Sequence, residues 1–122
     1  MEFDNNKSIF LQIADTITEK VVSGVYPPGE KIPSVRELAA GLGVNPNTIM
    51  RTYNELQTAS IIENRRGIGY FVNPKAQKLI LERKRSEFYS KVLPAFLRQA
   101  SLLGITSSDL KKHLDQLNHE TA

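Results

Sequence analysis

Four polar residues within one short stretch carry side chains that can form hydrogen bonds to the edges of nucleic-acid bases. They are Asn47, Thr48, Arg51 and Asn54. Arginine can donate two hydrogen bonds to guanine, asparagine can pair in the same way with adenine, and threonine can bond to a base or touch a thymine methyl group. On a wheel of 100° per residue, the side opposite Asn47, Arg51 and Asn54 holds packing residues. These are Ile49, Thr52, Tyr53 and Leu56. The alternative is a polar helix face that is only solvated.

Two different start signals predict a pair of helices that would position these side chains. Ser34 with Glu37 three residues later is a capping box, so a helix should run from Val35 to Leu42. Asn45 followed by Pro46 predicts the start of a second helix, since proline suits the first helical position. Glycine and valine alone separate the two helices. The pattern predicts a helix-turn-helix, in which the start of the second helix approaches DNA most closely and Asn47, Thr48 and Arg51 rank above Asn54.

The segment after the second helix predicts a β-hairpin. Two β-prone runs, residues 61–63 and 70–72, flank a turn rich in arginine and glycine. The turn residues that could approach a phosphate or the minor groove are Arg65, Arg66, Gly67 and Gly69. Solvated arginines are the alternative, but a hairpin directly after a helix-turn-helix completes a winged helix.

The segment before the helix-turn-helix predicts a first helix from about Ser8 to Ser23, with Gly24 as its stop. Its inward stripe is expected to hold Phe10, Ile13, Ala14, Ile17 and Val21. In the proline-rich link that follows, Lys31 and Ile32 could add a short edge strand beside the wing.

Residues 8–73, with the runs GVNPNTIMRTYNEL and RRGIGYFV, resemble the DNA-binding domain of GntR-family bacterial transcription regulators of the YtrA subfamily. The resemblance implies a phosphate contact for Arg36 and a minor-groove approach for Gly67 and Gly69. It implies contacts with bases or phosphate at the start of the second helix, by Asn45, Asn47 and Thr48. Many longer members carry arginines where this chain has Pro46 and Met50, so base reading must move to neighbours. The full predicted DNA-binding set is Lys31, Ser34, Arg36, Asn45, Pro46, Asn47, Thr48, Arg51, Asn54, Arg65, Arg66, Gly67 and Gly69.

Charge does not single out the winged helix. The 122-residue chain has a net charge of +3, but residues 1–74 hold 7 Lys and Arg against 8 Asp and Glu. DNA binding must therefore depend on where individual cations point. The chain has no cysteine and no apolar run near the ~20 residues needed to cross a bilayer. Its N-terminus, with Glu2 and Asp4, lacks the basic region typical of a signal peptide. We expect a cytoplasmic protein without metal or cofactor.

Residues 75–122 carry a second pattern, large apolar residues at helical spacing. The set is Leu79, Phe88, Val92, Phe96, Leu97, Leu103, Leu110, Leu114 and Leu117. A kink or break is expected near Pro94, and Thr106 with Asp109 should cap a last helix. A small winged helix cannot cover so many apolar side chains. We therefore predict an isologous homodimer whose recognition helices lie about 34 to 36 Å apart, one turn of DNA.

The predicted division is a winged helix-turn-helix over residues 1–74 and a helical dimerisation tail over 75–122, mainly α with a small β-hairpin. The tail is expected to be too short to enclose a pocket of ~300–1,000 Å³ in one subunit, which leaves a crevice between subunits and an unknown effector open. A basic cluster, Lys75, Lys78, Arg83, Lys84 and Arg85, could touch flanking phosphates, although a solvated face is favoured.

Three other classes are weaker. An enzyme is disfavoured because the sequence has no nucleophile elbow, no phosphate-binding loop and no paired carboxylates. The two histidines, His113 and His119, lie six residues apart near the C-terminus. A winged helix that binds proteins would be expected to have an apolar recognition face, whereas the face predicted here is polar. A protein-interaction module without specific DNA binding remains the alternative. A fragment of an aminotransferase-fused regulator is disfavoured by the capped last helix. The sequence thus predicts a sequence-specific DNA-binding transcription regulator, with repression favoured, that binds a palindromic operator as a homodimer.

Overall fold

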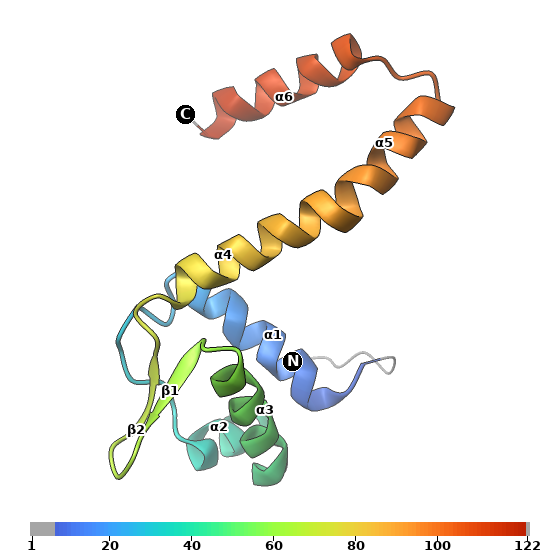
Figure 1. Ribbon diagram of the computed structural model, residues 1–122. Helices are drawn as coiled ribbons and strands as arrows, with labels where there is room; N and C mark the ends of the chain where they lie inside the picture. Colours follow the sequence, from blue (N-terminus) through green and yellow to red (C-terminus); the bar gives the residue numbers. More distant parts are fainter. Residues whose placement is uncertain (1–6, 122) are drawn as a thin grey trace. The chain divides into compact units, whose positions relative to one another are not determined.

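The chain consists of two compact units in the computed structural model, which describes residues 7–121 and the side chains of residues 7–118. The units divide between Arg83 and Lys84 and are described separately below. Helices make up most of both units (Figure 1). Within residues 7–121, no helix is both long and apolar enough to cross a membrane.

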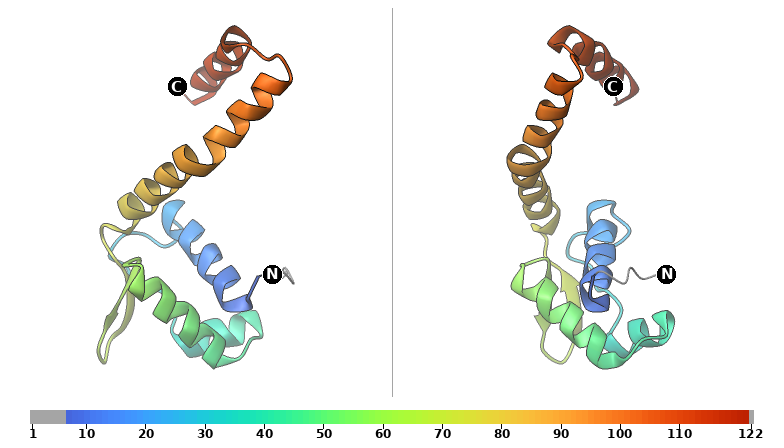
Figure 2. Two further views of the ribbon diagram at one scale, coloured as in Figure 1. Left: turned by 45° about the vertical axis from the view of Figure 1, so that its right-hand side comes forward. Right: turned by 90° about the vertical axis from the view of Figure 1, so that its right-hand side faces the viewer.

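The first unit is a three-helix winged-helix domain followed by the start of a fourth helix. Its elements are α1 (Ile9–Val22), α2 (Val35–Leu42), α3 (Pro46–Thr58), β1 (Ile62–Arg65), β2 (Gly69–Val72) and the beginning of α4 (Ala76–Glu87). Helix α3 packs against both α1 and α2, and the hairpin lies beside it (Figure 1, Figure 2). The predicted helix-turn-helix and wing are both confirmed.

The core forms where α1 and α3 face each other. Ile13, Ile17 and Val21 from α1 are buried, as are Ile49 and Leu56 from α3. Their spacing places them on one side of each helix, which is why both helices are amphipathic. Phe10 does not belong to this core: it lies half-buried at the start of α1, contrary to its predicted place in the inward stripe.

The core continues beyond the hairpin into α4. Ala76 and Ile80 are buried against it, and the side-chain amide of Gln77 donates to the carbonyl of Val22 at the end of α1 (2.8 Å). Arg83 donates to the carbonyl of Ala59, which ends α3 (2.7 Å). The compact unit therefore runs nine residues past position 74.

The wing has a two-stranded antiparallel sheet in which Ile62 pairs with Val72 and Arg65 with Gly69. The link before α2 adds a third, edge segment. Lys31 forms a bridge with Phe71, and the amide of Ile32 donates to the carbonyl of Tyr70 (2.9 Å). The predicted edge strand is thus present as a bridge, which prolines on either side keep short.

Tyr53 ties α3 to the segment that leads into α2. Its fully buried side chain donates to the carbonyl of Pro33 (2.6 Å), and its ring packs edge-on against Tyr70, with centroids 4.8 Å apart. Burial raises the pKa of the Tyr53 hydroxyl, so this group stays protonated and remains a donor throughout the physiological range.

Replacing Tyr53 by phenylalanine should lower the free energy of unfolding by about 1–3 kcal/mol, because it removes the partner of the Pro33 carbonyl. Urea unfolding followed by circular dichroism measures the change. Tyr70→Phe is the matched control, since the Tyr70 hydroxyl has only a 4.0 Å contact with the sulfur of Met50. Equal losses in the two variants would contradict this role for Tyr53.

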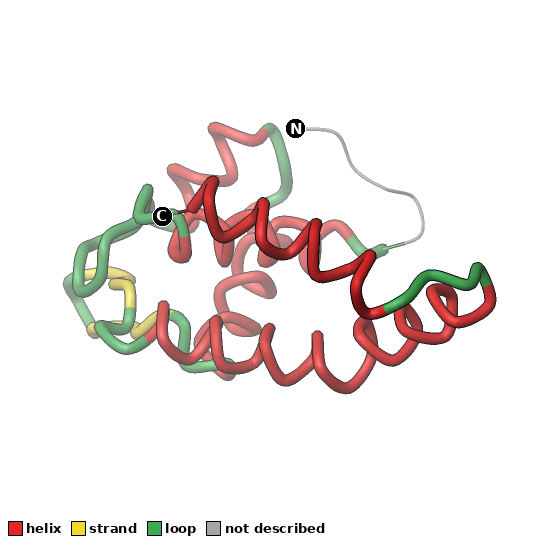
Figure 3. Tube along the Cα trace, turned by 90° about the horizontal axis from the view of Figure 1, so that it is seen from above, coloured by secondary structure: helices red, strands yellow, loops and turns green. Residues whose placement is uncertain are grey.

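The second unit, residues 84–122, contains the end of α4, a π-helical turn (Phe88–Val92), α5 (Leu93–Leu102) and α6 (Ser107–Thr121). The tube in Figure 3 shows helix in red from α4 into α5 and again along α6. The structure has no break at Pro94. The π-helical turn lies just before this proline, and the amide of Leu93 donates to the carbonyl of Phe88. Such a widened turn lets a helix continue past a residue that has no N–H.

The turn between α5 and α6 follows the predicted pattern. Gly104 has a φ of 68° and leaves α5. The amide of Asp109 donates to the hydroxyl of Thr106 (3.2 Å), and the amide of Thr106 donates to the Asp109 carboxylate (3.0 Å). This reciprocal cap begins α6 as the sequence predicts.

Candidate nucleic-acid interface

Helix α3 starts with a side-chain cap at Asn45. The amide of Asn47 donates to Oδ1 of Asn45 (2.8 Å), and Pro46 occupies the first helical position. The Asn45 oxygen accepts one hydrogen bond in this cap, and the side-chain nitrogen carries the donors that Asn45 can offer to DNA. Pro46 contributes a fixed start to the helix but no donor of its own.

The outward face of α3 is polar, as the helical wheel predicts. Asn47, Arg51 and Asn54 are exposed and Thr48 is half-buried. The opposite face holds the four buried residues of the helix: Ile49, Thr52, Tyr53 and Leu56. The burial of the inward face fixes the rotation of α3, so its hydrogen-bonding side chains are turned to solvent.

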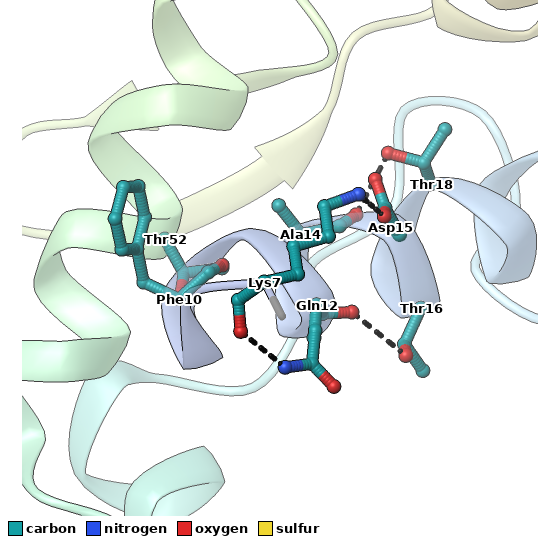
Figure 4. Close-up of polar contacts among 8 residues, drawn as sticks. All are labelled: Lys7, Phe10, Gln12, Ala14, Asp15, Thr16, Thr18 and Thr52. Carbon is teal, nitrogen blue, oxygen red and sulfur yellow. Dashed lines mark hydrogen bonds and ion pairs between the residues drawn. The ribbon is translucent and has the colours of Figure 1, made fainter. Parts of the chain in front are cut away.

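Arg51 has a specific neighbour on α1. Its guanidinium carbon lies 4.1 Å from the centroid of the Phe10 ring, a cation–π stack. The next residue, Thr52, is fully buried and donates its hydroxyl to the Phe10 carbonyl (3.0 Å). Figure 4 shows Phe10 and Thr52 where α1 meets α3. Periodicity alone predicts a core position for Phe10 and no role at this surface.

The start of α2 is held by the predicted capping box. The amide of Glu37 donates to the Ser34 hydroxyl, and the amide of Ser34 donates to the Glu37 carboxylate, each at 3.1 Å. Ser34 is therefore engaged in the cap, whereas Arg36 lies exposed in the first turn of α2. The hydrogen bonds from Ser34 hold the pKa of Glu37 below its usual value of 4.5.

This cap predicts a pH dependence of stability. A carboxylate whose folded pKa is depressed adds stability above its unfolded pKa, and that stability is lost as the pH falls through the folded value. The difference in melting temperature between the wild type and Glu37→Gln should therefore shrink below about pH 4.5. Thermal unfolding at pH 7 and at successively lower pH tests it. A melting-temperature difference that does not change with pH would contradict the role assigned to the Glu37 carboxylate.

The wing carries its two arginines in different surroundings. Arg65, at the end of β1, stacks on the ring of Phe71 (4.1 Å) and lies 3.8 Å from the carboxylate of Glu63. Arg66 is exposed in the turn, next to Gly67 with a φ of 78°. The positive φ explains the glycine. Arg66 is the more accessible of the two charges for a phosphate.

Gly69 provides room for Lys31. A Cβ atom at Gly69 would lie 2.7 Å from Cε of Lys31, and the φ of Gly69 is 139°, a conformation that other residues rarely adopt. The Lys31 side chain thus crosses β2 at this position. The structure gives Gly69 a local role in addition to the minor-groove approach that the resemblance implies.

The winged helix matches a known family over most of its length. Residues 10–72 match the sequence profile of the bacterial regulatory proteins of the gntR family. The chain belongs to the GntR family. It is a helix-turn-helix DNA-binding transcription regulator rather than an enzyme, as the family and its relatives are.

Individual relatives of this GntR-family chain cover the tail as well as the winged helix. The uncharacterised regulator YhcF of Bacillus subtilis is 42% identical over 109 residues, which are 89% of this chain and 88% of YhcF. The transcriptional repressor YtrA of the same organism is 32% identical over 90% of this chain and 84% of its own. A GntR-family regulator from Bacteroides thetaiotaomicron has a similar crystal structure, with a TM-score of 0.77, 37% identity, and coverage of 94% of this chain and all of the other.

The tail of this GntR-family chain has an apolar groove within its second unit. The groove holds about 530 Å³ and is lined by Phe88, Tyr89, Val92, Leu93, Phe96, Leu97, Leu110, His113 and Leu114. The tail is predicted to be too short to enclose a pocket in one subunit. The return of α6 along the π-helical turn and α5 forms an open groove instead of an enclosed pocket. Six of the nine predicted dimerisation residues line the groove.

The other three predicted dimerisation residues lie elsewhere. Leu103 and Leu117 are exposed, and neither lines the groove. Leu79 is half-buried and belongs to the first compact unit. In the basic cluster, Arg83 is engaged by the carbonyl of Ala59, whereas Lys75, Lys78, Lys84 and Arg85 are exposed.

Proposed function

We propose that this GntR-family regulator is a homodimeric repressor that binds a palindromic operator through two copies of α3 and the wing. The observation that carries the proposal is the outward face of α3. Its start is fixed by Asn45 and Pro46, and apart from Pro46 and Met50 its exposed residues carry hydrogen-bonding side chains. A winged helix used for protein contacts would need an apolar outward face on this helix.

The side chains divide by chemistry into base readers and phosphate contacts. Asn47, Thr48, Arg51 and Asn54 read base edges in the major groove, because amide, hydroxyl and guanidinium groups discriminate base pairs there. Lys31, Arg36 and Arg66 contact phosphates, with the flexible glycines of the wing allowing close approach. Arg65 contributes less, since Glu63 and Phe71 already engage it.

The groove in the tail supports the homodimer. Phe96 and Leu97 remain about half exposed, and Val92 and Leu114 are more than half exposed, although all four are apolar. A contiguous apolar surface of this kind is typical of a protein interface. A second copy would cover it with the same residues, as an isologous interface requires. The tail would then hold two recognition helices at a fixed separation.

Repression is supported by the relative that is named a repressor, YtrA, which aligns over both the winged helix and the tail. The sign of regulation is tested by deleting the gene and measuring transcripts. Genes with the selected operator in their promoters should rise in the deletion strain. A fall in these transcripts would assign activation instead.

Selection of bound DNA from a random pool tests the operator. We expect an enriched palindrome with two half-sites about 10 base pairs apart from centre to centre, since a two-fold dimer presents its helices one DNA turn apart. Sedimentation of the protein without DNA should give a dimer at micromolar concentration. Enrichment of a single unpaired half-site, or a monomer in sedimentation, would contradict the dimeric arrangement.

A further inference from the structure

The stack of Arg51 on Phe10 lies between two shallow hollows on the surface of the first unit. One hollow, of about 160 Å³, is lined by Ser8, Ile9, Phe10, Thr48 and Arg51. The other, of about 270 Å³, is lined by Phe10, Arg51, Asn54, Glu55 and Thr58. Among the residues that the structure describes, only Phe10 and Arg51 border both hollows, so this pair lies between them.

We propose that Phe10 is a positioning residue for DNA recognition, because its ring holds the Arg51 guanidinium in the orientation from which it reads a base. This inference rests on the proposed function, in which Arg51 is a base reader. It assigns a part of sequence recognition to α1, outside the helix-turn-helix. Phe10 acts through Arg51 and not through a contact of its own with DNA.

The contact is compatible with base reading because a guanidinium whose carbon lies 4.1 Å from a ring centroid can rest on the ring by its flat face alone. The N–H donors of arginine lie in the plane of the group and point outward from its edge. Within residues 7–121, the Arg51 side chain has no recorded hydrogen bond or ion pair to the protein. Its donors therefore remain available for the two acceptors of guanine.

The position of Phe10 is itself fixed against α3. The hydroxyl of Thr52 donates to the Phe10 carbonyl at 3.0 Å, and to the carbonyl of Thr48 at 2.9 Å. Thr52 is fully buried and follows Arg51 directly in α3. Because α1 also packs along α3 through the core, Phe10 lies on the helix that makes the most extensive contact with α3.

Loss of the ring should release Arg51 to other rotamers. A free arginine side chain must be ordered again when it binds a base, and that ordering costs free energy. An exposed cation–π contact changes an equilibrium by about two- to fivefold. Phe10→Leu keeps the apolar contact and removes the aromatic face, whereas Phe10→Tyr keeps the face.

A double-mutant cycle on the selected operator tests the proposal. The variants are Phe10→Leu, Phe10→Tyr, Arg51→Ala and Phe10→Leu/Arg51→Ala. Each is titrated with the operator, with an operator changed at the base pair whose preference Arg51→Ala relaxes, and with random DNA. Thermal unfolding of each variant separates a loss of recognition from a loss of stability.

The expected result is a two- to fivefold weaker preference for the operator in Phe10→Leu, at the same base pair that Arg51→Ala relaxes. Phe10→Tyr should retain the wild-type preference, and Phe10→Leu should cause no further loss in the Arg51→Ala background. A loss that persists without Arg51, or that is equal on random DNA, would overturn the positioning role and leave the proposed function intact. A wild-type protein that selects no sequence would overturn both.

Discussion

Phe96→Asp should convert the protein to a monomer and weaken operator binding by about 10²–10⁴-fold, the range in which linkage of two binding modules raises avidity. Phe96 lies in the tail groove with 47% of its surface exposed. A carboxylate there would lose its hydration in an apolar interface between two copies, at a cost of several kcal/mol. The same carboxylate in a monomer would remain in water.

Sedimentation and operator titration measure the two effects together. Leu102→Asp is the matched control, because Leu102 lies on the same helix, is 86% exposed and does not line the groove. It should remain a dimer with wild-type affinity. Circular dichroism should show that Phe96→Asp keeps its helices. A Phe96→Asp variant that stays dimeric would place the interface elsewhere in the tail.

Arg51→Ala should weaken binding by about 1–3 kcal/mol for each half-site, or about five- to 150-fold, if Arg51 pairs with a guanine. The loss of base preference should be confined to one base-pair position in each half-site, because the other base-reading side chains are unchanged. Titration of the operator and of single base-pair variants measures it. Affinity for random DNA should fall much less.

Arg36→Ala is the comparison that separates the two roles. Arg36 is exposed in the first turn of α2, and a phosphate contact from it would carry no sequence information. Its loss should weaken all DNA sequences alike and reduce the salt slope by about 0.9 for each subunit. If Arg36→Ala and Arg51→Ala both lost the same affinity for the operator as for random DNA, the division between base reader and phosphate contact would be contradicted.

The elements of the winged helix could be predicted from sequence because their signals are local. Ser34 with Glu37 and Asn45 with Pro46 are within a few residues of the backbone groups that they satisfy. The same is true of Thr106 and Asp109 at the start of α6. Helical periodicity then fixed which face of α3 is buried, and therefore which side chains point outward.

The contacts that the sequence did not predict join residues that are distant along the chain. The stack of Phe10 with Arg51, the passage of Lys31 over Gly69 and the bond from Arg83 to Ala59 all depend on how elements meet. Periodicity assigns a residue to a face of a helix but not to a position opposite the partner helix. Periodicity therefore predicts a core position for Phe10, although the residue lies at the end where α1 meets the exposed part of α3.

The π-helical turn in the tail could not be predicted for a similar reason. Pro94 favours a kink or break when only its missing donor and its ring are considered. A single widened turn over residues 88–92 accommodates both and keeps the helix continuous. The groove depends on the packing of α6 along this helix. No short-range sequence pattern predicts that packing.

The stack on Phe10 bears on attempts to exchange specificity between regulators. If a segment containing only α2 and α3 were transplanted into a related scaffold, Arg51 would arrive without the ring that supports it. The recipient would have to supply an aromatic residue at the matching place in its first helix. If Phe10 positions Arg51, recognition in this protein is not contained in the helix-turn-helix alone, and transplants should include α1.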